Sequence, residues 1–180
     1  MSANTIKIER AIDRKKTSSK HSNIPRVINQ TFKTTDIPSR MHDAAQSWIK
    51  MNPTFEYRFY DDADQIDFIG RHFCKDVQKA YSKLNSGAFR ADLWRYCLLS
   101  VEGGIYADID TICRVDLNEI IRPDDDFIAP RAGNLQYAIF NAFICSRPNN
   151  PFLRKAIERA TMLIIRSGKF DGYMATGPGN

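Results

Sequence analysis

Two aspartates separated by one residue, Asp108 and Asp110, could bind a divalent cation. They close a predicted strand, so alternation along it would put both carboxylates on one face, with Cα atoms roughly 6–7 Å apart, and turn Ile109 toward the core. Carboxylate oxygens suit Mg²⁺ or Mn²⁺, which retain water and bridge to phosphate oxygens. We predict that Asp110 ligates the metal directly and that Asp108 acts through water or on a sugar hydroxyl. A solvated acidic loop is the alternative.

A second charged pair, Asp92 and Arg95, lies on the strongest predicted helix, residues 87–102. This helix is apolar almost all round and must be largely buried. Ala88, Asp92, Arg95 and Leu99 nevertheless fall on one stripe. Burying an ion pair costs several kcal/mol per ion before pairing recovers part of it, so we predict that the stripe faces a polar pocket. An ordinary surface pair, worth a few tenths of a kcal/mol, is the alternative.

Two glycines connect the helical pair to the acidic pair. Gly103 and Gly104 end the helix in a turn where side chains would obstruct the close approach of another backbone or of a ligand. A strand over residues 105–109 follows and leads directly into the second acidic residue. All four charged side chains are therefore predicted to lie near one end of that strand.

The other predicted elements alternate between strands and helices over the first two thirds of the chain. Further strands are predicted at residues 24–28, 55–60 and 126–129, a hairpin-like pair at 136–140 and 142–145, and helices at 39–52, 62–84, 117–121 and 151–168. In the region 62–84 the expected inner positions are Ile66, Ile69, Phe73, Val77 and Tyr81. This order predicts an α/β fold with a mainly parallel central sheet flanked by helices, and ligands at the carboxyl ends of its strands.

Length and composition favour one folded domain. The chain has 180 residues, 43% hydrophobic and 11% aromatic, which argues against disorder. No apolar run approaches the roughly 18 residues of a membrane span, and the first residues lack the apolar core of a secretory signal. We expect a soluble, cytoplasmic protein. Its four cysteines show no metal-binding spacing and are expected to be reduced and mostly buried.

The net charge of +5 is concentrated near the N-terminus. Residues 1–20 contain six basic and two acidic side chains, while the remainder is nearly neutral, which argues against nucleic acid as a partner. We predict a basic, flexible tail over residues 1–22, with peripheral contact to an anionic membrane as one role and a solvated leader as the other. The folded domain then spans residues 23–180.

The central block resembles a known enzyme family. The order A-D-x-x-R-Y-x-x-L-x-x-x-G-G-x-Y-x-D-x-D, from Ala91 to Asp110, is similar to the signature of the DXD-containing glycosyltransferases of family thirty-two. That family includes initiation-type mannosyltransferases and capsular polysaccharide enzymes, and related blocks occur in glucosylating toxins. Residues 24–33 and 55–62, Asn141 with 146–153, and 176–178 resemble further family segments, so the likeness extends from 24 to 178.

The resemblance implies a GT-A-like fold and transfer of a sugar from a nucleoside-diphosphate sugar, UDP- or GDP-linked. The acceptor would be a hydroxyl of a glycan, a lipid-linked glycan or a protein, the anomeric configuration would be retained, and Mn²⁺ or Mg²⁺ would be the cofactor. Asp92 and Arg95 would hold the donor sugar and its phosphate side, Asp108 would contact ribose or sugar and a metal-bound water, and Asp110 would bind the metal. Further substrate contacts are implied for Ile28, Gln30, Phe32, Ala88, Gly104, Tyr106 and Asn141.

The chain departs from the family pattern at several places. Ala91 replaces a common Ser, and Asn29 and Phe32 stand where His and Trp are frequent, so base stacking would fall to the smaller Phe32 ring. The chain ends at Asn180, whereas relatives continue, so the domain at 23–180 is expected to lack their C-terminal part.

Two other functions fit parts of this pattern. Asp108 and Asp110 also resemble the first motif of haloacid-dehalogenase-type phosphatases, in which one Asp is the nucleophile and the other the acid/base, with Asp124 to Asp126 as the later acidic pair. That motif stands late in this chain, and Asp92 and Arg95 have no role in such an enzyme. The second alternative is an inactive protein that still binds a sugar nucleotide.

Overall fold

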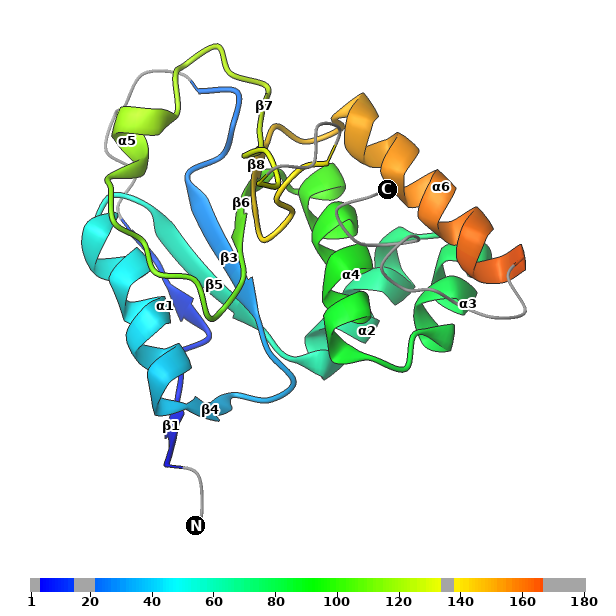
Figure 1. Cartoon of the computed structure of the whole chain (residues 1–180), viewed down its shortest axis with the longest axis horizontal. Coiled ribbons are helices and arrows are strands. Elements are labelled where there is room, and N and C mark those ends of the chain that lie inside the picture. The colour runs from blue at the N-terminus through cyan, green and yellow to red at the C-terminus, as the bar shows by residue number, and fades with distance from the viewer. Residues whose placement is uncertain (1–3, 15–21, 134–137, 167–180) are drawn as a thin grey trace.

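A six-stranded sheet forms the centre of the protein, with strand order β2-β5-β3-β6-β8-β7 (Figure 1). The computed structural model describes residues 4–14, 22–133 and 138–166. Its strands are β1 (Thr5–Lys7), β2 (Ala11–Ile12), β3 (Val27–Thr31), β4 (Asp36–Pro38), β5 (Glu56–Tyr60), β6 (Gly104–Ala107), β7 (Phe127–Ile128) and β8 (Phe143–Ser146). Its helices are α1 (Ser39–Met51), α2 (Asp62–His72), α3 (Lys75–Lys83), α4 (Gly87–Val101), α5 (Leu117–Ile120) and α6 (Pro151–Arg166).

The sheet is mixed, which corrects the prediction of a mainly parallel one. Strands β5, β3 and β6 are parallel at its centre, whereas β2, β8 and β7 add antiparallel pairings toward both edges. The alternation of strands and helices predicts only the parallel centre. The antiparallel edges arise where β2, from the N-terminal segment, pairs with β5 and where β8 pairs with β6 and β7. The predicted α/β class with flanking helices is confirmed.

Helices cover both faces of the sheet (Figure 1). Helix α1 packs on one face through Ala45 and Trp48, in one apolar cluster with Ile28 and Ile105. Helices α2, α3, α4 and α6 form the other layer, and α4 lies at its centre. All eight residues from Leu93 to Ser100 are buried, as the apolar pattern of this helix predicts. The buried position of α4 fixes its polar residues firmly against the sheet.

The N-terminal segment is part of the fold as far as the structure describes it. Strand β1 pairs with β4, β2 pairs with β5, and Ile8 between them is only 3% exposed. Arg10 forms ion pairs with Asp61 and Asp64 at the start of α2. The predicted flexible tail is therefore wrong for residues 4–14, because strand pairing, the buried Ile8 and the ion pairs of Arg10 attach this segment to the fold. Residues 1–3 and 15–21 lie outside the described residues.

Several element boundaries differ from the predictions. The first central strand covers 27–31 instead of 24–28, because Asn29, Gln30 and Thr31 are buried and hydrogen-bonded inside the sheet. Ile66, predicted to face inward, is 56% exposed, since α2 turns it away from α4.

The predicted hairpin is also wrong in its described part. Strand β8 pairs with β6 and β7, and Ile139 forms an isolated bridge with Arg131. Residues 134–137 lie outside the described range. The helices predicted at 39–52 and 151–168 are confirmed as α1 and, over its described part, α6.

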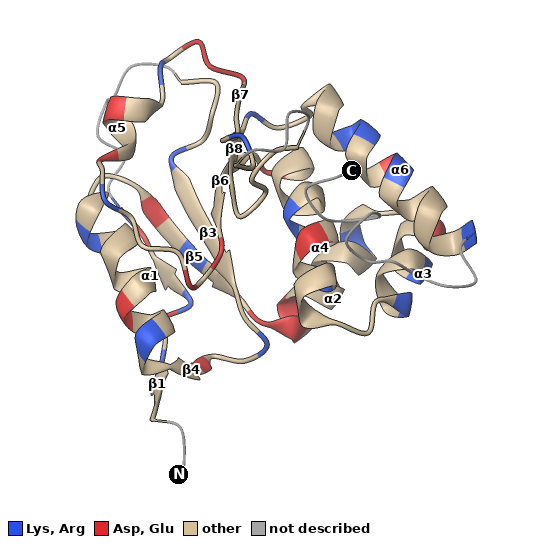
Figure 2. Cartoon of the chain, in the orientation of Figure 1, with Lys and Arg blue, Asp and Glu red and all other residues tan. Residues whose placement is uncertain are grey.

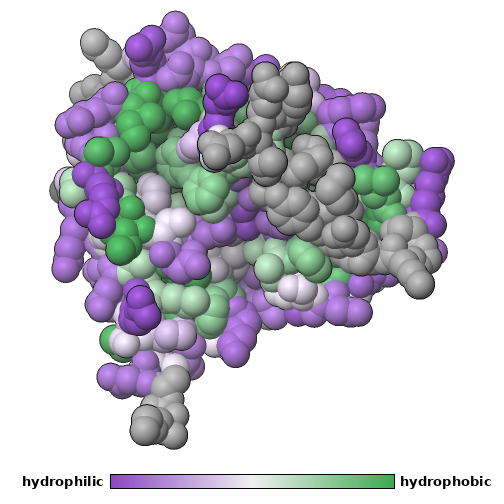
Figure 3. All heavy atoms as spheres, viewed as in Figure 1, coloured by the Kyte–Doolittle hydropathy of each residue, from purple (hydrophilic) through white to green (hydrophobic). Residues whose placement is uncertain are grey.

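The cysteines are mostly buried, as the sequence predicts. Cys97, Cys113 and Cys145 are buried, Cys74 is exposed, and none of the four forms a disulfide. Among the described helices, none has the length and apolar character needed to cross a membrane. Hydrophobic side chains gather over α5 (Figure 3), where Ile120 is 37% exposed.

Candidate active site

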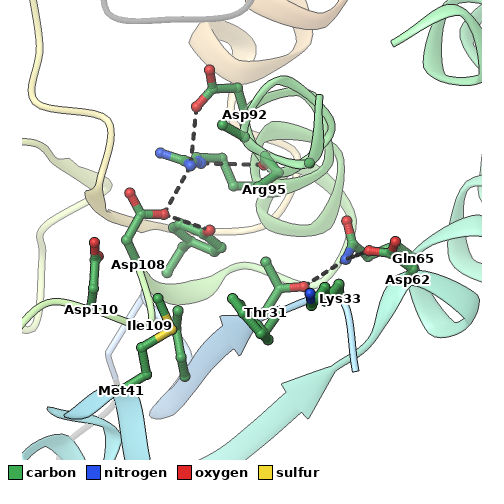
Figure 4. Close-up of a pocket in the computed structure, with 15 residues that line it drawn as sticks. Thr31, Lys33, Met41, Asp62, Gln65, Asp92, Arg95, Asp108, Ile109 and Asp110 are labelled. Carbon is green, nitrogen blue, oxygen red and sulfur yellow. Dashed lines mark hydrogen bonds and ion pairs between the residues drawn. The ribbon is translucent and has the colours of Figure 1, made fainter. Parts of the chain in front are cut away.

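A pocket of about 370 Å³ opens at the carboxyl ends of β3 and β6, beside the first turns of α4 (Figure 4). Acidic residues from α2, α4 and the turn after β6 lie around this region, although they are far apart in sequence (Figure 2). The pocket is lined by residues 31–33, Met41, Asp62, Gln65, Gly87, Ala88, Ala91, Asp92, Arg95, Tyr106 and 108–110. Its position agrees with the rule that ligands bind at the carboxyl ends of the strands in α/β sheets.

Arg95 joins Asp92 of α4 to Asp108 of the acidic pair at one end of the pocket (Figure 4). Its Nη2 lies 2.9 Å from Oδ1 of Asp108 and 3.0 Å from Oδ1 of Asp92. Its Nη1 donates to the carbonyl of Asn141 at 2.6 Å, and its guanidinium lies over the Tyr106 ring. The side chain is only 3% exposed. We call this group, Asp92, Arg95, Asp108 and Asp110, the α4 end of the pocket.

The electrostatics of Arg95 follow from these contacts. Burial by itself lowers the pKa of the guanidinium, but Tyr106, Asp108 and Asp92 together raise it above its ordinary value. Arg95 therefore stays charged and holds two carboxylates in place on the pocket wall. This burial favours a positioning role over the direct phosphate contact that the resemblance implies.

Asp92 is held from a second side by Asn141. The Asn141 amide donates to Oδ1 of Asp92 at 3.1 Å and to the Tyr96 hydroxyl at 3.3 Å. Burial raises the pKa of Tyr96 to about 12, so its hydroxyl remains protonated near neutral pH. Asp92 itself is 14% exposed and reaches the pocket. Its carboxylate is thus fixed in orientation at the pocket wall.

Asp108 and Asp110 lie in a turn after β6, which corrects the prediction that they continue the strand. The strand ends at Ala107, and the Thr111 amide donates to the Asp108 carbonyl at 3.0 Å to close the turn. The Gln30 amide also donates to that carbonyl, at 3.2 Å. Ile109 is 6% exposed and belongs to the core, as predicted. Both carboxylates still border the pocket, with Asp110 the more exposed one.

The ionisation of Asp108 is shifted by its surroundings. Burial raises the pKa of this carboxyl and outweighs the lowering by Arg95 and by the Tyr106 hydroxyl, which donates to Oδ1 at 2.8 Å; the charge of Asp110 raises it further. A cation near both carboxylates would relieve that repulsion. Oδ1 of Asp108 is thus committed to two protein donors.

The donor set fits a hard divalent cation in part. Asp110 and the second oxygen of Asp108 are the carboxylate oxygens at the pocket that suit Mg²⁺ or Mn²⁺. Within the described residues, no group of three His, Cys, Asp or Glu side chains could enclose a metal. An ion bound by these two aspartates would complete its shell with water and substrate oxygens, as Mg²⁺ commonly does.

The two glycines before β6 are required by backbone contacts. Gly103 and Gly104 both have positive φ, and a Cβ on Gly104 would lie 2.9 Å from the Val27 carbonyl. A Cβ on Gly103 would lie 2.7 Å from Pro148. Of the two predicted reasons for these glycines, the structure supports the close approach of another backbone. Gly104 does not line the pocket.

The other residues implied as substrate contacts divide into two groups. Phe32, Ala88 and Tyr106 line the pocket. Ile28, Gln30 and Asn141 do not line it: Ile28 is core, Gln30 supports the turn at Asp108, and Asn141 orients Asp92. For this second group the geometry favours a supporting role over substrate contact.

The opposite end of the pocket contains residues to which the sequence assigned no role. Thr31, Lys33, Asp62 and Gln65 come from the end of β3 and the first turn of α2, and we call them the α2 end of the pocket. Met41 from α1 completes the lining. The sequence does contain a signal for them: Thr31 and Lys33 flank Phe32, and Asp62 follows the strand predicted at 55–60. The ends of parallel strands meet at one edge of a sheet, so these residues could have been expected near the same site.

The family of the chain follows from a family match that covers half of its residues. Residues 38–127 match the family described as the glycosyltransferase sugar-binding region containing DXD motif. The matched region includes the α4 end of the pocket. The chain belongs to this glycosyltransferase family.

Individual relatives support the same assignment. An uncharacterized glycosyltransferase, L373, of Acanthamoeba polyphaga mimivirus is 32% identical over 130 residues, covering 71% of this chain and 52% of the relative. The mannosyl phosphorylinositol ceramide synthase SUR1 of Saccharomyces cerevisiae is 29% identical, covering 75% of this chain and 34% of the relative. The initiation-specific alpha-1,6-mannosyltransferase of Schizosaccharomyces pombe is 26% identical, covering 78% and 40%. The chain thus spans about half or less of the length of these relatives.

A solved structure shares the fold. The PaToxG glycosyltransferase superimposes with a TM-score of 0.72 at 20% identity, over 87% of this chain and 66% of that one. This similarity confirms the predicted GT-A-like architecture.

Proposed function

We propose that this chain contains the donor-binding site of a metal-dependent glycosyltransferase. The donor is a nucleoside-diphosphate sugar, UDP- or GDP-linked, and the acceptor is a hydroxyl of a glycan, lipid or protein, with the anomeric configuration retained. The observation that carries the proposal is the buried Arg95, which holds Asp92 and Asp108 together on the pocket wall beside the exposed Asp110. Membership in the DXD family supports it.

In this proposal the residues of the α4 end divide the work. Asp110 and the second oxygen of Asp108 would hold Mn²⁺ or Mg²⁺, whose charge would stabilise the diphosphate as it leaves. Asp92, which lines the pocket and is held in orientation by Arg95 and Asn141, would accept hydrogen bonds from sugar hydroxyls. Arg95 keeps the two carboxylates oriented and adds a fixed positive charge behind the departing phosphate.

The acceptor and the place of action are further parts of the proposal. Relatives named as mannosyl phosphorylinositol ceramide synthases support a mannosyl donor and a lipid-borne hydroxyl as acceptor. A cytoplasmic location with peripheral membrane contact through the basic residues 1–22 also stays a proposal. Polysaccharide synthesis is the other setting consistent with the family.

The phosphatase alternative is less compatible with the geometry. A phosphatase of that type has no role for Asp92 and Arg95, whereas here Arg95 joins Asp92 and Asp108 in one buried ion network at the pocket. The family match also lies with glycosyltransferases.

The test is a donor-cleavage and transfer assay with UDP- and GDP-sugars, with Mn²⁺ or with a chelator. We expect metal-dependent release of nucleoside diphosphate, lost in Asp110→Asn by 10²-fold or more, as for removal of a key electrostatic group. Asp67→Asn is the matched control, because Asp67 is an exposed α2 residue that does not line the pocket and pairs with Arg71. Activity that survives both chelation and Asp110→Asn would contradict the mechanism. Metal-dependent binding without turnover would favour the inactive binder.

A further inference from the structure

The α2 end of the pocket contains a carboxylate whose side-chain partners, among the residues that the structure describes, lie at long distances. Asp62 lines the pocket, and its side chain is 35% exposed. Its Oδ2 lies 3.7 Å from Nη2 of Arg90, and its Oδ1 accepts from the Gln65 amide at 3.5 Å. Both distances are long for hydrogen bonds. The Asp62 carboxylate therefore keeps most of its capacity to accept hydrogen bonds from a ligand.

Its acidic neighbours are engaged elsewhere. Asp61 caps α2 by accepting from the amides of Ala63 and Asp64, and both Asp61 and Asp64 pair with Arg10. Gln65 donates to Thr31 at 2.7 Å and accepts from the Tyr81 hydroxyl at 2.9 Å. These bonds hold the first turn of α2 in place. They leave Asp62 as the carboxylate of that turn that faces the pocket (Figure 4).

This step rests on the proposed function. If the metal and diphosphate lie against Asp108 and Asp110, the nucleoside must extend from them along the pocket. Phe32, partly exposed at the end of β3, offers a ring face on which a base can stack. Asp62 and Lys33 line the pocket together with Phe32. Lys33 follows Phe32 in the chain, and the Asp62 amide donates to the Lys33 carbonyl at 3.4 Å, so the edge of the stacked base would meet both residues.

Guanine and uracil differ in the hydrogen-bond donors and acceptors that they would present to Asp62 and Lys33. Guanine presents two adjacent donors, N1–H and the N2 amine, which match the two oxygens of a carboxylate, and its O6 accepts from an ammonium group. Uracil has a single donor, N3–H, between two carbonyl oxygens. It can therefore give a carboxylate one hydrogen bond, while the second carboxylate oxygen faces a carbonyl oxygen and is repelled. We propose that Asp62 reads the donor nucleobase and selects guanine over uracil, with Lys33 donating to guanine O6.

The test is calorimetric titration of the full chain with GDP, UDP and IDP in the presence of Mn²⁺. We expect GDP to bind at least tenfold more tightly than UDP, since hydrogen bonds to a charged group contribute about 1.5–3 kcal/mol. IDP, which lacks the N2 amine, should fall between the two. Asp62→Asn should weaken GDP about tenfold or more and leave UDP within about twofold.

A gain of binding makes the test independent of damage to the fold. Xanthosine diphosphate carries a carbonyl in place of the N2 amine, so the amide introduced by Asp62→Asn can donate to it. That variant should bind xanthosine diphosphate more tightly than wild type does, while Asp67→Asn matches wild type with all four nucleotides.

The outcomes separate the two proposals. Equal binding of GDP and UDP, or an equal loss of both in Asp62→Asn, would overturn base selection by Asp62 and leave the proposed donor site intact. No metal-dependent binding of any nucleoside diphosphate would overturn the proposed function itself.

Discussion

The two ends of the pocket are built differently. At the α4 end, Arg95 is 3% exposed and joins Asp92 and Asp108 at 3.0 and 2.9 Å. At the α2 end, Asp62 is 35% exposed, and its Arg90 partner lies at 3.7 Å. A buried ion network cannot move without exposing unpaired charge, whereas a half-exposed carboxylate can adjust to a ligand. The rigid α4 end thus suits a binding task that is the same for every substrate, and the adjustable α2 end suits discrimination among substrates.

The strongest test of this difference removes the central cation of the α4 end. Arg95→Met leaves two partly buried carboxylates without their partner, so the free energy of unfolding should fall by about 3 kcal/mol or more. Arg71→Met is the control, because Arg71 is 64% exposed and its pair with Asp67 should contribute less than about 1 kcal/mol. Denaturant unfolding measures both. Equal effects would mean that the α4 end is no more rigid than the surface.

The second test concerns the backbone behind the α4 end. Gly104→Ala places a Cβ 2.9 Å from the Val27 carbonyl at a φ of +97°, which should reduce the free energy of unfolding by about 1–3 kcal/mol. Gly87→Ala should be neutral or slightly stabilising, because nothing lies within 4 Å of its Cβ position. A neutral Gly104→Ala in thermal unfolding would show that this backbone contact is dispensable.

The third test separates stability from binding. Asp110 is exposed, so Asp110→Asn should change the free energy of unfolding by less than about 0.5 kcal/mol. Metal-dependent binding of nucleoside diphosphate should nevertheless weaken by tenfold or more, measured by calorimetry with and without Mn²⁺. Unchanged binding would remove Asp110 from the proposed metal site.

The smallest expected effect is the pH dependence contributed by Asp108. Its pKa in the folded state is raised by burial, so the native protein binds more protons than the unfolded chain between the ordinary and the raised value. The contribution of Asp108 to stability is therefore full below its unfolded pKa and declines as pH rises through the folded one. Unfolding of wild type and Asp108→Asn across this acidic range should show a difference that shifts against wild type with rising pH. A difference independent of pH would contradict the raised pKa.

Sequence reasoning succeeds where residue type and local spacing are sufficient. The apolar pattern predicts α4 and its burial, and the polar stripe within it predicts that Asp92 and Arg95 face a pocket. The turn at Asp108 is missed because its geometry depends on the distant side chain of Gln30 and on the Thr111 amide. Asp62 is missed because an acidic residue in the first turn of a helix is usual, and only packing shows which one faces the pocket.

By itself, the sequence determines the main helices, the parallel strands at the centre of the sheet, the class of fold and the four charged residues of the α4 end, because these follow from periodicity and from motif spacing along neighbouring residues. The tertiary structure decides which of those groups are bonded to one another, that Arg95 is buried between two carboxylates, and that Asp62 and Lys33 lie across the same pocket. Such relations join residues of β3, α2, α4 and β6, and their distances are set by how the layers pack.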